Sequence, residues 1–126
     1  MVNCYYITGE SIDAGVYKPG KTFQRRTYDR VRKYNEGPHT NPVLVLNEYH
    51  FSSVRAVEIL ENHIKSYFLK NRRPAKAPNT GKKEVMDIKY DILIAEVEKY
   101  INDNLSKELT RKQQHESIQF GNLFEN

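Results

Sequence analysis

The chain has 126 residues and a formal net charge of +4 at pH 7, with 38% hydrophobic and 29% charged residues. This length suits one compact domain, and the composition excludes collagen-like repeats and wholesale disorder. A single cysteine, Cys4, excludes an intramolecular disulfide framework and a cysteine-rich zinc site. Apolar runs stay below the roughly 18 residues of a membrane span, and the N-terminus lacks a secretory signal pattern. We therefore expect a cytoplasmic protein with no membrane partner.

Positive charge is concentrated in the first two thirds of the chain. Residues 1–83 carry a net charge of +8, whereas residues 84–126 carry −4. Within the basic part, residues 17–33 and 62–83 each hold seven Lys or Arg side chains and at most one acidic side chain. Such clusters favour contact with nucleic-acid phosphates over an evenly solvated surface. The candidates for this contact are Lys21, Arg25, Arg26, Lys33, Lys65, Arg72 and Arg73.

The N-terminal half predicts a hairpin, a helix and a strand. Residues 3–8 are rich in β-formers, and residues 16–18 resume extended structure after a glycine-containing turn. Pro19 belongs at the end or edge of the second strand, because proline cannot donate a ladder hydrogen bond. Apolar or aromatic positions four, four and three residues apart predict a helix over residues 23–33. Residues 43–46 form an apolar run that predicts a buried strand, and the residues after it alternate in character.

A second helix, a basic loop and a last strand are predicted next. Ser52 or Ser53 is a suitable N-cap for a helix over residues 54–69, whose apolar positions follow a helical period. Residues 70–83 contain two prolines and a glycine, which predict an irregular basic loop. Residues 84–88 predict a short strand.

The C-terminal part begins with an amphipathic pattern. Residues 90–109 repeat apolar side chains at steps of four, three, four and four, which predicts a helix with an acidic outer face. Beyond Leu109 the pattern fades, and we expect a fraying helix end and a loose tail. We therefore divide the chain into a domain over residues 1–89 and a C-terminal helix with a tail over residues 90–126. This helix could pack on its own sheet, pair with a second copy, or cover the basic residues as an inhibitory lid.

The order of the predicted elements indicates the fold class. Hairpins interspersed with helices favour an α+β fold, with a small, mostly antiparallel sheet flanked by helices.

Glu61 is the carboxylate that the spacing singles out. It follows Val57 by four residues and precedes Ile64 by three, so it borders the buried face of its helix. A carboxylate in that place is a suitable ligand for a hard divalent cation. The simpler alternative is an ion pair with Lys65 one turn later, worth about 0.2–0.5 kcal/mol, and residue types alone favour this pair.

Several short motifs occur in the order found in GIY-YIG nucleases. The two strands of the predicted hairpin carry Asn-Cys-Tyr-Tyr-Ile from residue 3 and Val-Tyr-Lys-Pro-Gly from residue 16, which resemble the two named motifs. Arg30-Val31 on the first helix and Leu60-Glu61 on the second continue that order. The likeness covers about residues 3–88. It is closest to a phage and mobile-element branch whose second motif reads KIG, some members of which are known only as DNA-binding proteins.

The resemblance implies a small antiparallel sheet flanked by helices, with one divalent ion, Mg²⁺ or Mn²⁺, on Glu61. It implies that Tyr5 orients or deprotonates the attacking water and that Lys18 takes the place of the second motif tyrosine. Arg30 would stabilise charge on the scissile phosphate, and Arg25 or Arg26 would do so if the helix began later. The implied catalytic residues are Tyr5, Tyr17, Lys18, Arg30 and Glu61, with Glu61 as the metal ligand.

The sequence therefore predicts a metal-dependent DNA endonuclease that hydrolyses phosphodiester bonds, acting in the host cytoplasm if the chain is viral. We expect Tyr5, Lys18, Arg30 and Glu61 to converge on one concave face. Because Lys18 replaces a tyrosine, the alternative is a non-catalytic DNA-binding protein on the same fold, and a third reading is a protein–protein module. RNA is not excluded as the partner, and cutting both strands would require a homodimer or two sequential nicks.

Overall fold

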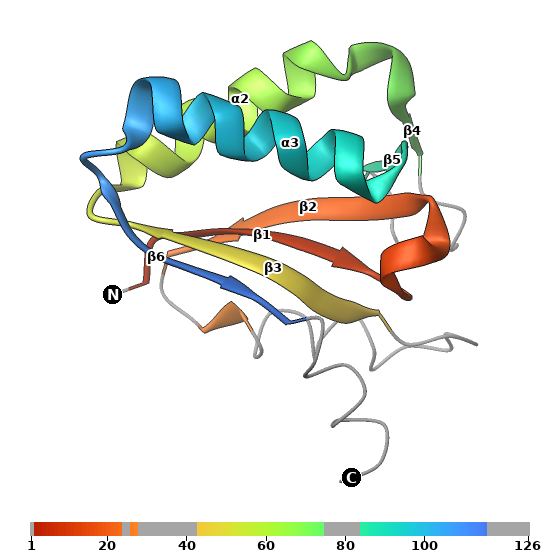
Figure 1. Cartoon of the computed structure of the whole chain (residues 1–126), viewed down its shortest axis with the longest axis horizontal. Helices are drawn as coiled ribbons and strands as arrows, with labels where there is room; N and C mark the ends of the chain where they lie inside the picture. The colour runs from red at the N-terminus through yellow and green to blue at the C-terminus, as the bar shows by residue number, and fades with distance from the viewer. Residues whose placement is uncertain (1, 24–25, 28–42, 75–83, 116–126) are drawn as a thin grey trace, which may run out of the picture.

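The computed structural model describes residues 2–23, 26–27, 43–74 and 84–115 (Figure 1). Over these residues the fold is α+β, with a six-stranded antiparallel sheet in the order β4-β5-β2-β1-β3-β6. Two α-helices lie side by side over one face of this sheet (Figure 1). The predicted fold class, a small antiparallel sheet flanked by helices, is confirmed.

The described residues form six strands, two α-helices and three short helical turns. The strands are β1 (Cys4–Gly9), β2 (Val16–Thr22), β3 (Leu44–Phe51), β4 (Arg72–Pro74), β5 (Glu84–Asp87) and β6 (Leu109–Gln114). The helices are α2 (Val54–Tyr67) and α3 (Tyr90–Tyr100), with the short helical turns η1 (Ile12–Ala14), η2 (Leu69–Asn71) and η3 (Ile101–Leu105). The helix expected over residues 23–33 lies almost wholly outside the described residues.

The β1–β2 hairpin sets which side chains share a face. Tyr5 stands opposite Lys21, Tyr6 opposite Gly20, and Thr8 opposite Lys18. Directly opposed residues of antiparallel strands point to the same face, so Tyr5 and Lys21 share one face and Tyr6 and Lys18 the other. Gly20 is required here because a Cβ atom would come within 2.5 Å of the Tyr6 ring.

Pro19 lies within β2 at a position where the strand is an edge among the described strands, which is one of the two places that its residue type predicts. The next strand, β5, pairs with β2 only at Val16 and Tyr17. Pro19 therefore has no second neighbour among the described strands, and the outer side of β2 needs no backbone donor there.

Helix α2 begins and packs as its sequence predicts. The Ser53 side chain accepts a hydrogen bond from the Ala56 amide at 3.2 Å, which is the expected N-cap. The helix ends at Tyr67, two residues earlier than predicted. Its buried residues, which follow the predicted stripe, are Ala56, Val57, Leu60 and Ile64.

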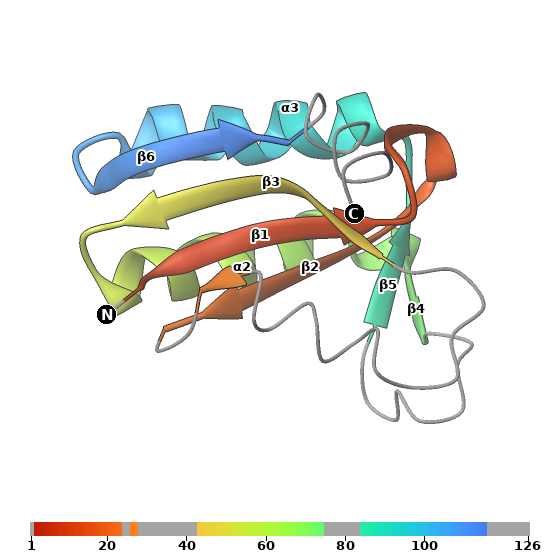
Figure 2. The same ribbon diagram turned by 90° about the horizontal axis from the view of Figure 1, so that it is seen from below.

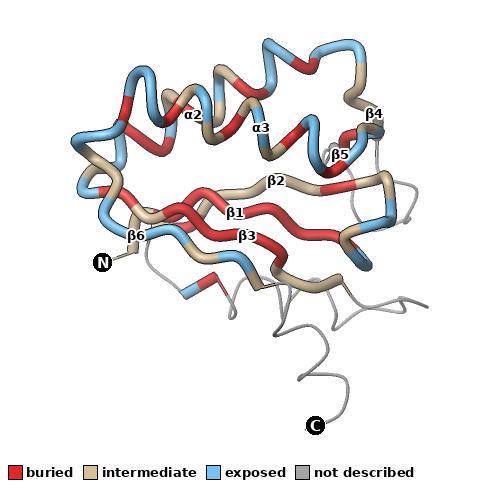
Figure 3. Tube along the Cα trace, viewed as in Figure 1, coloured by how far each residue is buried: buried red, intermediate tan, exposed pale blue. Residues whose placement is uncertain are grey.

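Helix α3 belongs to the same hydrophobic core as the N-terminal strands. Leu93 and Val97 are fully buried, and the core cluster that contains them also contains Tyr5 and Ile7 of β1. Figure 3 shows buried positions along both helices and the central strands. The segment from Tyr90 to Leu105 thus contributes buried side chains to this core. Within the described residues, no helix combines the length and the apolar character needed to cross a membrane.

Two predicted irregular segments contain strands. The loose tail expected after Leu109 is wrong for Leu109–Gln114, which form β6 and pair with β3. The irregular loop expected over residues 70–83 is wrong for Arg72–Pro74, which form β4 against β5. Seen from below, β6, β3, β1 and β2 run side by side in front of the helices (Figure 2).

Candidate functional site

Two polar clusters lie on opposite faces of the sheet. The Glu61 cluster is on the helix side and consists of Tyr5, Lys21, Glu61 and Lys65. The Glu48 cluster is on the other side and consists of Cys4, Glu48, His50 and His115.

The Glu61 cluster joins helix α2 to strand β2. Oε1 of Glu61 lies 2.8 Å from Nζ of Lys21, and Oε2 lies 3.6 Å from Nζ of Lys65. The predicted pair between Glu61 and Lys65 is therefore present, and Lys21 adds a contact that the helix pattern alone does not provide. The side chain of Glu61 is only 15% exposed, whereas those of Lys21 and Lys65 are 34% and 48% exposed. The carboxylate thus sits between two ammonium groups at the edge of the core.

Tyr5 lies beneath this ion pair, on the same side of the sheet. It is 1% exposed and stands opposite Lys21 in the hairpin register. Burial, and secondly the charge of Glu61, raise the pKa of the Tyr5 hydroxyl above its ordinary value. A phenol whose pKa is raised stays protonated at neutral pH, so it can donate a hydrogen bond but does not act as a base.

The second hairpin strand separates Tyr17 from Lys18. Tyr17 is buried on the helix side, where its hydroxyl donates to the Ile12 carbonyl and accepts from the Gly15 amide. Tyr17 therefore closes the β1–β2 connection. Lys18 stands opposite Thr8 on the face away from the helices. The structure brings Tyr5 and Glu61 together but places Lys18 on the other side, and Arg30 lies outside the described residues.

The basic residues expected to contact nucleic acid are spread over the molecule. Lys21 and Lys65 flank Glu61, as above. Arg73 on β4 pairs with Asp87 of β5, and its neighbour Arg72 is half-buried on the same strand. Arg26 is exposed and lines a pocket on the side away from the helices. Arg25 and Lys33 lie outside the described residues.

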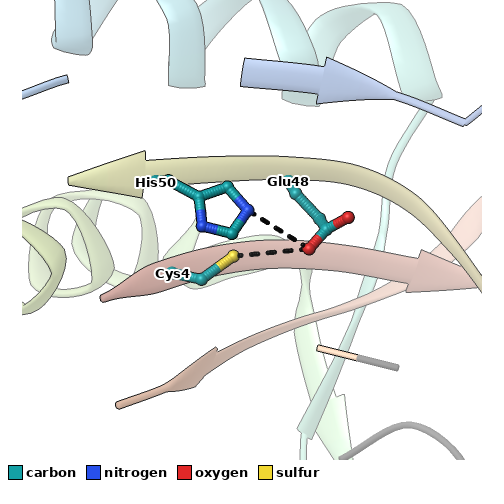
Figure 4. A group of neighbouring side chains, drawn as sticks. All are labelled: Cys4, Glu48 and His50. Carbon is teal, nitrogen blue, oxygen red and sulfur yellow. Dashed lines mark hydrogen bonds and ion pairs between the residues drawn. The ribbon is translucent and has the colours of Figure 1, made fainter. Parts of the chain in front are cut away.

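The Glu48 cluster is assembled by the pairing of β1 with β3. Cys4 stands opposite His50 and Tyr6 opposite Glu48, so these side chains share the face away from α2 and α3. Oε1 of Glu48 lies 3.3 Å from Nε2 of His50 and 3.9 Å from Sγ of Cys4 (Figure 4). Its other oxygen lies 2.5 Å from Nε2 of His115, the residue that follows β6. A group of cysteine, glutamate and histidine side chains so close together could hold a metal ion.

Burial and hydrogen bonding fix the charges in this cluster. Burial alone would raise the pKa of Glu48, but hydrogen bonds from His115 and Thr27, with the electrostatic interactions of His115 and His50, lower it to about 2. Burial raises the pKa of the Cys4 thiol to about 12, although Thr27 donates a hydrogen bond to Sγ at 3.3 Å. Burial and the nearby Arg111 lower the pKa of His50. At neutral pH the carboxylate is therefore ionised and the thiol protonated.

An open pocket of about 480 Å³ lies beside this cluster. Glu48 and His50 form part of its wall, together with Arg26 and Arg111. Arg111 donates a hydrogen bond to Nε2 of His50 at 3.0 Å. The pocket gives solvent access to a carboxylate and an imidazole that are otherwise largely buried.

Sequence reasoning did not single out Glu48 or His115. The alternation along β3 was the available signal, because Tyr49 and Phe51 face the helices and leave Glu48 and His50 on the opposite face. Nothing comparable pointed to His115, whose position depends on the unpredicted strand β6.

Comparison of the chain with protein-family models, curated proteins and solved structures found no match. The likeness to GIY-YIG nucleases rests on the short motifs within residues 3–88.

Proposed function

We propose that this chain is a metal-dependent DNA endonuclease of the GIY-YIG type, with Glu61 as the ligand of a divalent ion. The observation that carries the proposal is the position of Glu61. It lies between Lys21 and Lys65, on the side of the sheet that also holds Tyr5. A carboxylate that holds a metal ion and ammonium groups that bind phosphate oxygens are parts that metal-assisted phosphodiester hydrolysis uses.

The residues around Glu61 fit an ion of the Mg²⁺ type. Such ions are commonly held by one or two carboxylates, with water and substrate phosphates completing the coordination. The carboxylate of Glu61 is held by two ammonium groups, at 2.8 and 3.6 Å, so a divalent ion binds it once these groups move to the substrate. When bound, the ion supplies polarisation of the phosphoryl oxygen and stabilisation of the developing charge.

The side chains of the cluster have separable roles in this proposal. When DNA binds, the ammonium groups of Lys21 and Lys65 leave the carboxylate of Glu61 and bind phosphate oxygens instead. The carboxylate is then free to bind the divalent ion. Tyr5, kept protonated by its burial, does not remove a proton, and its role is to pack beneath the Glu61 carboxylate. In the reaction, the oxygen of a water molecule bonds to phosphorus, one phosphorus–ester oxygen bond breaks, and the proton of the water ends on the leaving oxygen or in solvent.

Replacing the carboxylate of Glu61 tests the proposal. We expect the full chain to nick supercoiled plasmid in the presence of Mg²⁺ or Mn²⁺, and Glu61→Gln to reduce the rate by about 100-fold or more. Glu58→Gln is the matched control, because Glu58 is exposed on the same helix, and it should cut like the unmodified chain. If Glu61→Gln cuts as fast as Glu58→Gln, Glu61 does not hold the catalytic ion.

The second candidate function is DNA binding without cleavage. The placement of the second motif favours it, because Lys18 points away from Glu61 and the Tyr17 hydroxyl bonds within the hairpin connection. A chain that binds plasmid but leaves it intact with both ions would establish this alternative over the first.

Both functions predict a salt-dependent affinity in which Lys65 takes part. Each phosphate contact contributes about 0.9 to the slope of log affinity against log salt for duplex DNA. We expect Lys65→Ala to weaken binding across sequences and to reduce that slope by about one. Lys99→Ala, at an exposed position on α3, should leave the slope unchanged. We would measure the slope of log affinity against log salt by fluorescence anisotropy at several salt concentrations. Equal slopes for the two variants would show that the Glu61 cluster does not contact DNA.

A further inference from the structure

We propose that Cys4, Glu48, His50 and His115 form a binding site for Zn²⁺ on the face of the sheet away from α2 and α3. This site is separate from the Glu61 cluster, and the inference does not depend on the proposed nuclease activity. Three of its ligands, on β1 and β3, already lie together. The fourth, His115 after β6, contacts Glu48 and would move toward the other two to complete the set.

The donor atoms have the chemistry that zinc prefers. Zn²⁺ binds cysteine sulfur, histidine nitrogen and carboxylate oxygen, most often four at a time. Magnesium and calcium instead prefer sets made only of oxygen atoms. Cys4, Glu48 and His50 offer one sulfur, one carboxylate and one imidazole nitrogen. His115, which lies against the other oxygen of Glu48, offers a second imidazole beside this group. This combination favours a transition metal over a hard cation.

The spacing of these atoms is close to that of a bound site. The ligand atoms of Cys4, Glu48 and His50 lie within 4.8 Å of one another. Bonds to zinc measure about 2.0–2.3 Å, so two donor atoms of a tetrahedral site lie about 3.3–3.8 Å apart. Rotations of three side chains that already point toward one another would close the difference (Figure 4).

Nε2 of His50 lies between a donor and an acceptor. The guanidinium of Arg111, which has only donors, lies 3.0 Å from this nitrogen. Oε1 of Glu48, an acceptor, lies 3.3 Å from it. The nitrogen can accept from Arg111 or, when protonated, donate to Glu48, but it cannot do both. Zinc bound to Nε2 and Oε1 would replace both contacts and release Arg111 toward the pocket.

A nucleophilic role for Cys4 does not fit the same geometry. A reactive cysteine needs an accessible thiolate, but Cys4 is fully buried and its pKa is raised to about 12. Catalytic groupings also place the histidine between the nucleophile and the carboxylate. Here Oε1 of Glu48 lies between Cys4 and His50 (Figure 4). Zinc binding would instead form a sulfur–metal bond and pass the thiol proton to solvent.

Cobalt and zinc titrations of the full, metal-free chain test the site. Co²⁺ bound to a cysteine gives a sulfur-to-cobalt charge-transfer absorption band, which a site built only from histidine and glutamate cannot give. We expect this band in the unmodified chain, its loss on addition of one equivalent of Zn²⁺, and a higher thermal unfolding midpoint with zinc. Absence of the band, with the fold intact by circular dichroism, would overturn the proposal.

Three variants separate this site from adventitious binding. Cys4→Ser should abolish the cobalt band and weaken zinc binding by at least about 10- to 100-fold, measured by competition with a chromophoric chelator. His63→Gln is the matched control, because His63 pairs with Glu96 at 2.8 Å without a nearby cysteine, and it should bind zinc normally. Arg111→Ala should tighten binding, since it removes a competing donor and a positive charge.

The outcomes of this comparison are decisive in both directions. Equal zinc affinity for Cys4→Ser and the unmodified chain would show that the metal binds elsewhere, and the Glu48 cluster would then be a buried ion-pair network. If Cys4→Ser fails to fold, the cobalt spectrum of the unmodified chain and the effect of Arg111→Ala decide the matter. None of these measurements uses nuclease activity, so the failure of one proposal leaves the other standing.

Discussion

A chain that ends at residue 89 is expected to lose its cooperative fold. The removed segment supplies a large part of the apolar core, and it also supplies β6, which pairs with β3. Each large apolar side chain buried in a core contributes about 1.5–3 kcal/mol, and the whole stability of a typical domain is about 5–15 kcal/mol. The removed core side chains are Tyr90, Leu93, Val97, Ile101 and Leu105.

Circular dichroism during urea unfolding measures this effect. The full chain should show one sigmoidal transition, whereas residues 1–89 should show a broad, non-cooperative change. The opposite outcome has a clear meaning. If residues 1–89 fold and bind DNA more tightly than the full chain, the acidic helix is a lid over the basic residues and not part of the core.

The central elements could be predicted because they carry strong periodic patterns. The stripe of Val57, Leu60 and Ile64 faces the core as its spacing indicated. In α3 the predicted apolar positions are part of the core except at one step. The spacing placed Ile94 on the buried face, but Leu93 is fully buried and Ile94 is only half-buried. A helix that packs against both a sheet and a second helix buries a broader arc than a single row of positions.

The two strands that the sequence did not predict are the two edges of the sheet. β6 reads Leu-Thr-Arg-Lys-Gln-Gln, and β4 reads Arg-Arg-Pro. Edge strands are commonly polar, charged or interrupted by proline, because such residues discourage pairing with other chains. The composition that protects an edge also removes the apolar alternation by which a strand is predicted.

The sequence could predict the side of the helix or strand on which each residue of the candidate site lies, because that position depends on one element alone. Glu61 borders the core face of its helix, and Tyr5 lies on the same side of the sheet. The pairing of Glu61 with Lys21 required the hairpin register, which motif order alone does not supply. His115 required both the β3–β6 pairing and a strand that composition conceals. Residues brought together by non-local strand pairing are therefore the ones that sequence reasoning missed.

The second large effect is expected from a single core substitution in α3. Leu93 is 0% exposed and lies on the core face of the helix, so Leu93→Ala should lower the free energy of unfolding by about 2–5 kcal/mol. The loss combines the missing transfer free energy of the side chain with the cost of the cavity that remains. Ile92, its neighbour in sequence, is 51% exposed, so Ile92→Ala should change stability by only about 0.5 kcal/mol.

Urea unfolding of the two alanine variants, followed by tyrosine fluorescence, measures this contrast under one set of conditions. A much lower midpoint for Leu93→Ala with an unchanged slope means that the variant keeps the same fold at lower stability. Equal midpoints for the two variants would contradict the placement of α3, because they would mean that neither face of the helix is buried against the sheet. That result would favour the alternative in which the C-terminal helix is a lid over the basic residues, because shortening an apolar side chain of a lid leaves the core intact.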